Sequence, residues 1–346
     1  MVIEINTDQL TDRYPNPLIT IDSHTEGEAT RLLISGISDI PGDTMVKKLQ
    51  YFESEQDQIR CLLTKEPRGP RGTLAAVVTE NVSPEASFGL LFMDARRYLH
   101  LCGHATIGAV ATLAEIGTLK LDEGQNVVSV DTPSGIMTVR VTLTDGAIVS
   151  LALKMVPSFV YQVDQKVKVD GFGEVVIDLV CTGGYFAMVN TEILGIEPVL
   201  KNKKVLTELG MKIIEAANEQ LIVSHPENPT VNTVDVTKFY QTETVDGQIR
   251  GRGFVIYGES HMDRSPCGTG TAAKLALLKY RNEIQMGQIY TSISPIGTTF
   301  TASMVETTRV GELEAVVAEI QGRAWITGVH HFCLDKNDPF NKGHLV

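Results

Sequence analysis

Short runs rich in β-branched residues, separated by polar turns, dominate the chain. Runs of this kind, bounded by turn residues, are typical of β-strands. The clearest of them lie at residues 19–22, 75–79, 127–130, 137–141, 175–180, 253–257 and 315–320. No low-complexity stretch or long linker interrupts the pattern. The sequence therefore predicts a chain built mostly of short strands.

Two segments depart from the strand pattern and predict helices. In residues 103–117 and 268–281, small and aliphatic side chains occupy nearly every helical face, as in a helix that is buried all round. Gly117 suits the position just after a helix, and Lys279 and Arg281 suit a last helical turn. We therefore expect two buried helices in a chain of strands.

The two predicted helices have matching surroundings in the sequence. Each follows directly on a Cys-Gly pair, at Cys102 and at Cys267, and each has a threonine four residues after its cysteine. The cysteines lie 165 positions apart (267 minus 102), close to half of the 346 residues. We expect an α/β protein with two pseudo-symmetric domains, each wrapping strands around one central buried helix. The helix starts would then face a shared cleft; chance similarity of two alanine-rich helices is the alternative.

We expect the N-terminal domain to comprise residues 1–155 together with the C-terminal segment 335–346. The C-terminal domain would comprise residues 156–334. A length of 346 residues suits two domains of ordinary size. Hydrophobic residues make up 43% and charged residues 21% of the chain, which is typical of a globular protein with a proper core.

Charge and cysteine usage narrow the class of protein. The net charge is −12 without a basic cluster, which argues against nucleic acid as a partner. No apolar run is long enough to span a membrane, and residues 1–14 lack the apolar core of a secretory signal. The cysteines are odd in number and include no CxxC pair, so we expect no disulfide framework, no metal and a cytoplasmic location. They are Cys61, Cys102, Cys181, Cys267 and Cys333.

A cysteine immediately before a helix occupies a chemically special position. The first N–H groups of the helix have no partner within it, and the helix dipole adds positive potential there. A thiolate is stabilised in that position, and its pKa is lowered. The same N–H groups can bind a substrate carboxylate, with Gly103, Gly268 and Gly270 leaving room for the approach. One such cysteine is more often inert packing, but two equivalent ones indicate a site.

Two such sites that face each other favour inversion at a carbon beside a carboxylate. One thiolate would remove the α-proton from one face, and the opposite thiol would return a proton to the other face. The helix starts would stabilise the charge that develops. His104 and Asp263 lie close in sequence to Cys102 and Cys267, where they can orient the thiols; the alternatives are a helix-start histidine and a capping carboxylate.

Three motifs are similar to the signatures of the proline racemase family. They are DSHTEGE at residues 22–28, LCGHATIG at 101–108 and DRSPCGTGT at 263–271. The family includes proline racemases, 4-hydroxyproline 2-epimerases and trans-3-hydroxyproline dehydratases. The resemblance covers nearly the whole chain, including residues 66–69, 183–187 and 326–332.

The resemblance implies a diaminopimelate-epimerase-like fold, a homodimer, and catalysis by Cys102 and Cys267 with no cofactor and no metal. It implies that Asp263 contacts the amine of a small-molecule amino-acid substrate. The dehydratases carry threonine at the position that matches Cys267, so the cysteine here argues against dehydration. The residues that match the family's carboxylate binders are Gly103, His104, Gly268 and Thr269.

Substrate choice rests on fewer residues. Residues 183–187 and 330–332 resemble proline racemases more than hydroxyproline epimerases, so proline is the expected substrate. Leu74 stands where racemases often carry phenylalanine, and Tyr257 adds a hydroxyl at another phenylalanine position. Tyr257 or His261 could therefore meet a ring hydroxyl, which makes conversion of trans-4-hydroxy-L-proline to cis-4-hydroxy-D-proline the alternative. The structural alternative is that Tyr257 only packs and His261 faces solvent.

Two further classes of function remain open from the sequence. A thiol-switch or amino-acid-binding protein without turnover would use a disulfide between Cys102 and Cys267 across the cleft. A metal-dependent lyase would use His24, His104 and His261 as ligands and would need bound metal.

Overall fold

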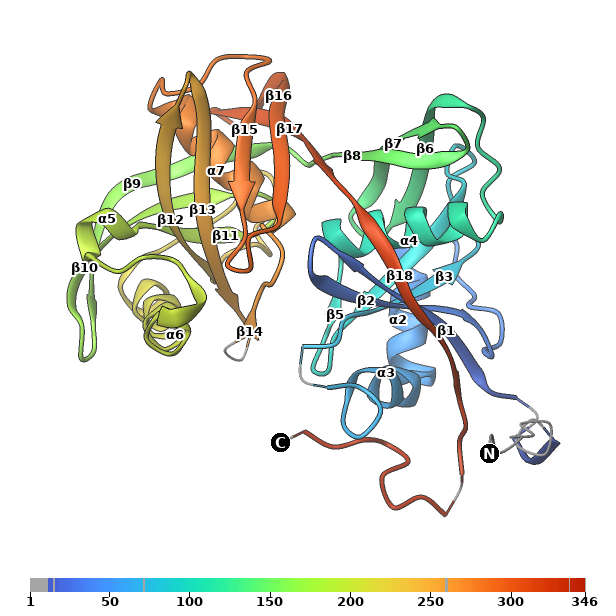
Figure 1. The fold of residues 1–346 in the computed structure, drawn as a ribbon. Coiled ribbons are helices and arrows are strands. Elements are labelled where there is room, and N and C mark those ends of the chain that lie inside the picture. Colours follow the sequence, from blue (N-terminus) through green and yellow to red (C-terminus); the bar gives the residue numbers. More distant parts are fainter. Residues whose placement is uncertain (1–11, 15, 71, 259–260, 336, 346) are drawn as a thin grey trace, which may run out of the picture.

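Two halves, each with a helix enclosed by strands, make up the molecule (Figure 1). The computed structural model describes the chain except residues 1–11, 15, 71, 259–260, 336 and 346. Most of the polar segment 1–14 therefore lies outside the described residues. Within the described part, no helix is long and apolar enough to cross a membrane.

The first half contains strands β1 to β8 and helices α2 to α4. Their bounds are β1 Leu18–Thr25, β2 Glu28–Ser35, α2 Met45–Glu55, α3 Asp57–Thr64, β3 Ala75–Thr79, β4 Phe88–Met93, β5 Tyr98–Leu99, α4 Gly103–Glu115, β6 Gly124–Thr132, β7 Gly135–Thr144 and β8 Ala147–Lys154.

The second half contains strands β9 to β17 and helices α5 to α7. Their bounds are β9 Ser158–Val169, β10 Gly173–Cys181, β11 Tyr185–Asn190, α5 Thr191–Leu194, the 3₁₀-helix η1 Leu200–Asn202, α6 Lys203–Gln220, β12 Val234–Val245, β13 Gln248–Tyr257, β14 His261–Met262, α7 Gly268–Tyr280, β15 Tyr290–Ile293, β16 Thr299–Val310 and β17 Leu313–Gly322.

Strand pairing repeats from the first half to the second. In the first half, β2 runs parallel to β3 and β4 runs parallel to β6, with β5 and α4 between β4 and β6 in sequence. In the second half, β11 runs parallel to β12 and β13 runs parallel to β15, with β14 and α7 between them. The antiparallel pairs also correspond, such as β3 with β4 and β12 with β13. The predicted duplication is therefore present in the topology.

Two strands connect the halves. β17 pairs with β8, and β18 (Ala324–Phe332) pairs with β1 from Leu18, opposite Phe332, to Thr25, opposite Ala324. β18 crosses to the first half in Figure 1. It lies inside the range 156–334 that we expected for the C-terminal domain, whereas its hydrogen bonds join the first half. The boundary near residue 155 stays a prediction.

The two helices predicted from their all-round apolar character are α4 and α7. Buried residues cover almost all of both helices. Strands β1, β2, β8 and β18 contact α4, and β9, β16 and β17 contact α7. Gly117 adopts a left-handed φ of 75° just after α4 and donates its N–H to the Ala114 carbonyl at 3.0 Å. The predicted end of this helix is therefore confirmed.

The prediction that the rest of the chain is mostly strand is wrong for α2, α3 and α6. Helices α2 and α6 bury one face and expose the other, unlike α4 and α7, whereas the short helix α3 is buried over residues 59–64. In α6, Leu206, Leu209, Ile213 and Ala217 follow helical spacing and belong to an apolar cluster of the second half. Exposed polar residues lie between them. Helical spacing, and not the content of β-branched residues, is the signal that identifies such helices.

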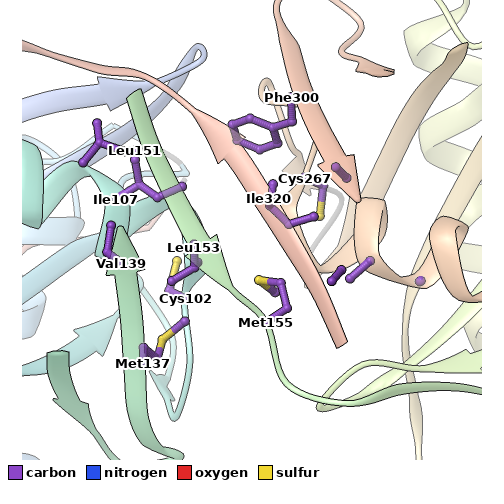
Figure 2. Packing of buried hydrophobic residues seen from close by; sticks show 14 of the residues in the cluster. Cys102, Ile107, Met137, Val139, Leu151, Leu153, Met155, Cys267, Phe300 and Ile320 are labelled. Carbon is purple, nitrogen blue, oxygen red and sulfur yellow. The ribbon is translucent and has the colours of Figure 1, made fainter. Parts of the chain in front are cut away.

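One apolar cluster spans both halves and includes both predicted catalytic cysteines. Figure 2 shows Cys102 near Met137 and Leu153 of the first half, and Cys267 on the side of Phe300 and Ile320 of the second. Helices α4 and α7 also contact each other. The core therefore brings the two helix starts into one region of the molecule.

Candidate active site

Cys102 and Cys267 occupy the same position on their helices. Each is the residue immediately before the first helical turn, as predicted, and each is buried, with 9% and 7% of its surface exposed. The Cys102 carbonyl accepts the N–H of Thr106 at 3.0 Å, and the Cys267 carbonyl accepts the N–H of Thr271 at 2.8 Å. The duplicated cysteine and threonine positions thus build matching helix starts.

The surroundings of Cys102 are dominated by His104. The Sγ atom of Cys102 lies 3.4 Å from Nδ1 of the buried His104 ring. Burial alone lowers the pKa of His104, but the adjacent Cys102, with smaller contributions from Glu28 and Asp263, raises that pKa to about 9. At neutral pH the imidazole is therefore protonated, which places a positive charge beside the Cys102 sulfur.

Cys267 lies in a different electrostatic environment. Its Sγ accepts the N–H of Gly270 at 3.3 Å and lies 3.5 Å from the Thr269 hydroxyl. Burial nevertheless raises the pKa of Cys267 to about 12, and Asp263 adds to this effect. The expectation that both helix starts lower the thiol pKa therefore fails at Cys267, because loss of hydration outweighs one backbone hydrogen bond.

Asp263 lies just before Cys267 and is held by Ser265. The Oδ1 atom of Asp263 accepts hydrogen bonds from the Ser265 N–H and hydroxyl, both at 2.8 Å. The Ser265 hydroxyl oxygen in turn accepts the Cys267 N–H at 3.0 Å. Burial, and then the charge of Glu28, raise the pKa of Asp263. This short chain of hydrogen bonds fixes the loop that presents the cysteine.

The start of α7 leaves space for a ligand beside Cys267. Among the described residues, no heavy atom outside its chain neighbours and the nearby backbone of α7 lies within 4 Å of the point that a Cβ on Gly268 would occupy. A Cβ on Gly103 would meet only Leu153, at 3.3 Å. The structure thus places Gly103, His104, Gly268 and Thr269 beside the cysteines, while their role as carboxylate binders stays a prediction.

Glu28 is a functional candidate that the sequence analysis missed. Its side chain is 1% exposed and reaches from β2 to the second half. It accepts the Arg264 N–H at 2.7 Å and the Arg264 guanidinium at 2.8 Å, and it lies 3.3 Å from Nε2 of His261. Burial alone raises the pKa of Glu28, but these partners lower it to about 2. The feature of the sequence that could have identified Glu28 as a candidate is its position in the motif at residues 22–28.

The three predicted specificity residues come together around one cavity. A cavity of about 200 Å³ is lined by Leu74 of the first half and by Tyr257 and His261 of the second. The rings of Tyr257 and His261 meet edge to face, with centroids 4.9 Å apart. Gly72 packs against the His261 ring, because a Cβ there would come within 2.3 Å of it. His261 is therefore held between the halves rather than free in solvent.

The histidines of the metal-lyase alternative do not form a common ligand set. The His24 ring stacks on Trp325, and its Nδ1 accepts the N–H of Gly27 at 3.2 Å. His104 lies against Cys102, and His261 against Glu28. Across the described ranges, no group of three or more His, Cys, Asp or Glu side chains is arranged to hold a metal ion.

Comparison with known proteins identifies the family of the chain. The family model for proline racemase matches residues 20–345. The chain is 37% identical to the proline racemase of Clostridioides difficile, over 96% of this chain and 99% of that protein. It is 36% identical to the 4-hydroxyproline 2-epimerase of Streptosporangium roseum, over 94% and 97% of the two chains. A trans-3-hydroxy-L-proline dehydratase from Bacillus cereus is 30% identical, over 94% of this chain and 97% of that protein.

The solved structures support the fold. The crystal structure of a hydroxyproline epimerase from Agrobacterium vitis, with bound trans-4-hydroxy-L-proline, matches with a TM-score of 0.86. The sequences are 30% identical, and the match covers 96% of both chains. The expected diaminopimelate-epimerase-like α/β fold is therefore confirmed. The chain belongs to the proline racemase family and is an isomerase of the racemase and epimerase type.

Proposed function

We propose that this isomerase inverts the α-carbon of proline by proton transfer to and from two cysteines, Cys102 and Cys267. The observation that carries the proposal is the matching position of the two sulfurs. Both precede a buried helix, the two helices contact each other, and both cysteines belong to one apolar cluster. A pair of thiols related by a duplication suits a reaction whose two directions are mirror images.

The surroundings of the two sulfurs support a direction for the first step. Protonated His104 lies beside Cys102, to which we assign the role of base, while the raised pKa of Cys267 keeps its thiol protonated as the acid. Cys102 removes the α-proton, and the electron pair of the broken C–H bond passes to the α-carbon and the carboxylate. Cys267 then delivers its proton to the opposite face. The product leaves Cys102 as the thiol and Cys267 as the thiolate, ready for the reverse direction.

Binding of the substrate would use the groups around the two helix starts. Backbone N–H groups at Gly103, His104, Gly268 and Thr269 would hold the carboxylate, where the helix dipoles favour negative charge. Asp263 would receive the substrate amine. The burial of both cysteines excludes water, which strengthens these interactions and protects the carbanion.

Epimerisation of 4-hydroxyproline is the second candidate, and the cavity beside the site favours it. Tyr257 and His261 bring polar atoms to a cavity that Leu74 also lines. A ring hydroxyl would find donors and acceptors there. A dehydratase is less well supported, because Cys267 is present where the resemblance implies threonine in dehydratases.

The protein is incubated with L-proline, trans-4-hydroxy-L-proline or trans-3-hydroxy-L-proline, and the products are separated by chiral chromatography. The product formed distinguishes the candidate reactions. D-Proline as the main product supports the first candidate, and cis-4-hydroxy-D-proline supports the second. Binding without turnover by the fully reduced protein would instead support an amino-acid-binding role. All five cysteines are free thiols in the structure, which fits the reduced state that the assay requires.

Assembly and location are further parts of this proposal. The resemblance supports a homodimer, and light scattering of the purified protein would test it. Free cysteines also suit the reducing cytoplasm. Fractionation of the source cells would test that location.

A further inference from the structure

Lys238 is a buried charged residue that the function proposed above does not use. It lies on β12, is 0% exposed, and its Nζ has no hydrogen-bond partner among the described residues. An ammonium without partners is costly to bury, and an apolar side chain of similar size would pack there without that cost. Fold stability therefore gives no reason for a lysine at this position.

The side chain of Lys238 passes directly behind Cys267. A Cβ on Gly270, in the first turn of α7, would lie 3.1 Å from Cδ of Lys238 and 3.2 Å from Sγ of Cys267. The lysine continues across β13, where a Cβ on Gly253 would lie 3.0 Å from its Cε and 3.3 Å from its Nζ. Two glycines thus make the room that brings this side chain next to the sulfur.

We propose that Lys238 is a positioning residue that places a buried positive charge behind Cys267 and so favours its thiolate. The proposal rests on the two-cysteine function proposed above. In that function Cys267 must be a thiolate whenever the opposite enantiomer reacts. Burial opposes this state, and the start of α7 alone supplies only one N–H to the sulfur. A nearby ammonium acts in the same direction as the helix dipole and adds to it.

The protonation of Lys238 is consistent with this role. Burial lowers the pKa of Lys238 to about 8, while Cys267 and Asp263 oppose that decrease. At neutral pH most of the lysine is protonated, and a thiolate at Cys267 would hold the proton on Nζ more firmly. The attraction is mutual, since Lys238 lowers the pKa of Cys267.

Other titratable groups surround this pair. Asp263, in the loop before α7, disfavours the Cys267 thiolate. Tyr257 at the end of β13 interacts with the Cys267 charge, and Lys274 farther along α7 interacts with Lys238. From the first half, His104 of α4 interacts with Asp263. Among the causes that shift the pKa of Cys267, Lys238 is the side chain that supplies positive charge.

Alkylation of Cys267 tests the proposal without any substrate. The full-length protein is treated with iodoacetamide at pH 7, where Lys238 carries its proton, and the rate of labelling is read at the Cys267 peptide by mass spectrometry. In Lys238→Met this rate is expected to fall roughly tenfold, because the thiolate fraction of Cys267 falls when the buried positive charge is removed. The melting temperature should stay equal or rise, because an unpaired buried charge is removed.

Lys274→Met is the matched control. Lys274 is also a lysine of the second half and is 2% exposed, but its ammonium lies over the Tyr240 ring, 3.8 Å from the centroid. Its removal should leave the rate of Cys267 labelling at pH 7 unchanged. An unchanged rate in a folded Lys238→Met protein, or an equal decrease in Lys274→Met, would overturn the proposal. Lys238→Gln provides the same test if methionine prevents folding.

The labelling result and the turnover result are independent. If the Lys238→Met substitution slows labelling of Cys267 but the unsubstituted protein converts no prolyl substrate, the proposed function fails and the role of Lys238 stands. Normal turnover, together with a labelling rate that Lys238→Met leaves unchanged, would do the reverse.

Discussion

Glu28 and Arg264 join the two halves of the chain beside the active site. The buried carboxylate of Glu28 accepts the backbone N–H of Arg264 at 2.7 Å and its guanidinium at 2.8 Å. Arg264 lies in the loop that leads to Cys267, and Glu28 begins the strand β2 that contacts α4. This ion pair therefore links the element that carries one sulfur to the scaffold of the other.

Replacement of Glu28 should loosen that link. In Glu28→Gln the guanidinium of Arg264 loses its charged partner, and we expect the free energy of unfolding to fall by about 2 kcal/mol. Turnover should fall roughly a hundredfold, more than the loss of folded protein would explain, because even small displacements of the catalytic groups slow the reaction. Urea unfolding and steady-state kinetics measure the two effects.

The pH dependence of this variant gives a second readout. The pKa of Glu28 lies near 2, below its ordinary value of 4.5, so the ion pair stabilises the fold above pH 4.5 and is lost as the pH falls towards 2. Glu28→Gln should lack this part of the acid transition. Asp43→Asn is the control, since the Asp43–Lys47 pair is exposed, with Asp43 73% accessible. Equal effects of the two variants would contradict the account.

Each catalytic cysteine should be indispensable for inversion. Cys102→Ser and Cys267→Ser each remove the acid or base of one face, and racemisation should fall by at least about a hundredfold. Cys333→Ser should retain activity, because this cysteine follows β18 at the edge of the molecule and is only partly buried. Polarimetry on the three purified variants measures the rates. Retained inversion in either active-site variant would argue against the two-base scheme.

His104 should titrate far above its ordinary range. Its pKa of about 9, compared with 6.5 for a free histidine, depends on Cys102. The interaction therefore stabilises the fold fully below pH 6.5 and is lost as the pH rises through 9. In Cys102→Ser the pKa of His104 should fall, since burial is then opposed only by the smaller contributions of Glu28 and Asp263. Proton NMR of the imidazole ring measures the pKa of His104. An unchanged pKa in Cys102→Ser would contradict the pairing of His104 with Cys102.

Tyr257 should influence the choice between proline and 4-hydroxyproline. Tyr257→Phe removes the hydroxyl but keeps the ring that packs against His261. Turnover of proline should be retained, while any turnover of trans-4-hydroxy-L-proline should fall roughly tenfold, because a ring hydroxyl would lose a hydrogen-bond partner. Competition between the two substrates measures the ratio. An equal decrease for both would show that Tyr257 only packs.

The sequence was most informative where burial leaves a simple pattern. Helices α4 and α7 carry small and aliphatic side chains on nearly every face, and the repeated Cys-Gly pair marks both starts, so the duplication and the two sulfurs could be predicted. Helix α6 was missed, although Leu206, Leu209, Ile213 and Ala217 follow helical spacing, because the prediction followed the content of β-branched residues instead. The return of β18 to pair with β1 could not be predicted either, since strand partners far apart in sequence leave no local signal.

The charged residues of the site were harder to identify. Lys238 lies in a strand of mixed polarity, where an isolated lysine is normally solvated. Its burial arises only in the folded chain, where the first turn of α7 and strand β13 lie against its side chain. The raised pKa of Cys267 was likewise hidden, because the sequence indicates the helix start but not the loss of water around the sulfur. Tertiary packing, which is not local, determines both features.

Proton exchange with solvent tests the central claim most directly. The protein is incubated with L-proline in heavy water, and the product is analysed by chiral chromatography with mass spectrometry. We predict D-proline that carries deuterium at the α-carbon, with L-proline labelled more slowly, because the proton on the product face comes from the solvent-equilibrated Cys267 thiol. The absence of α-deuterium in proline and in its 3- and 4-hydroxy derivatives would contradict the account.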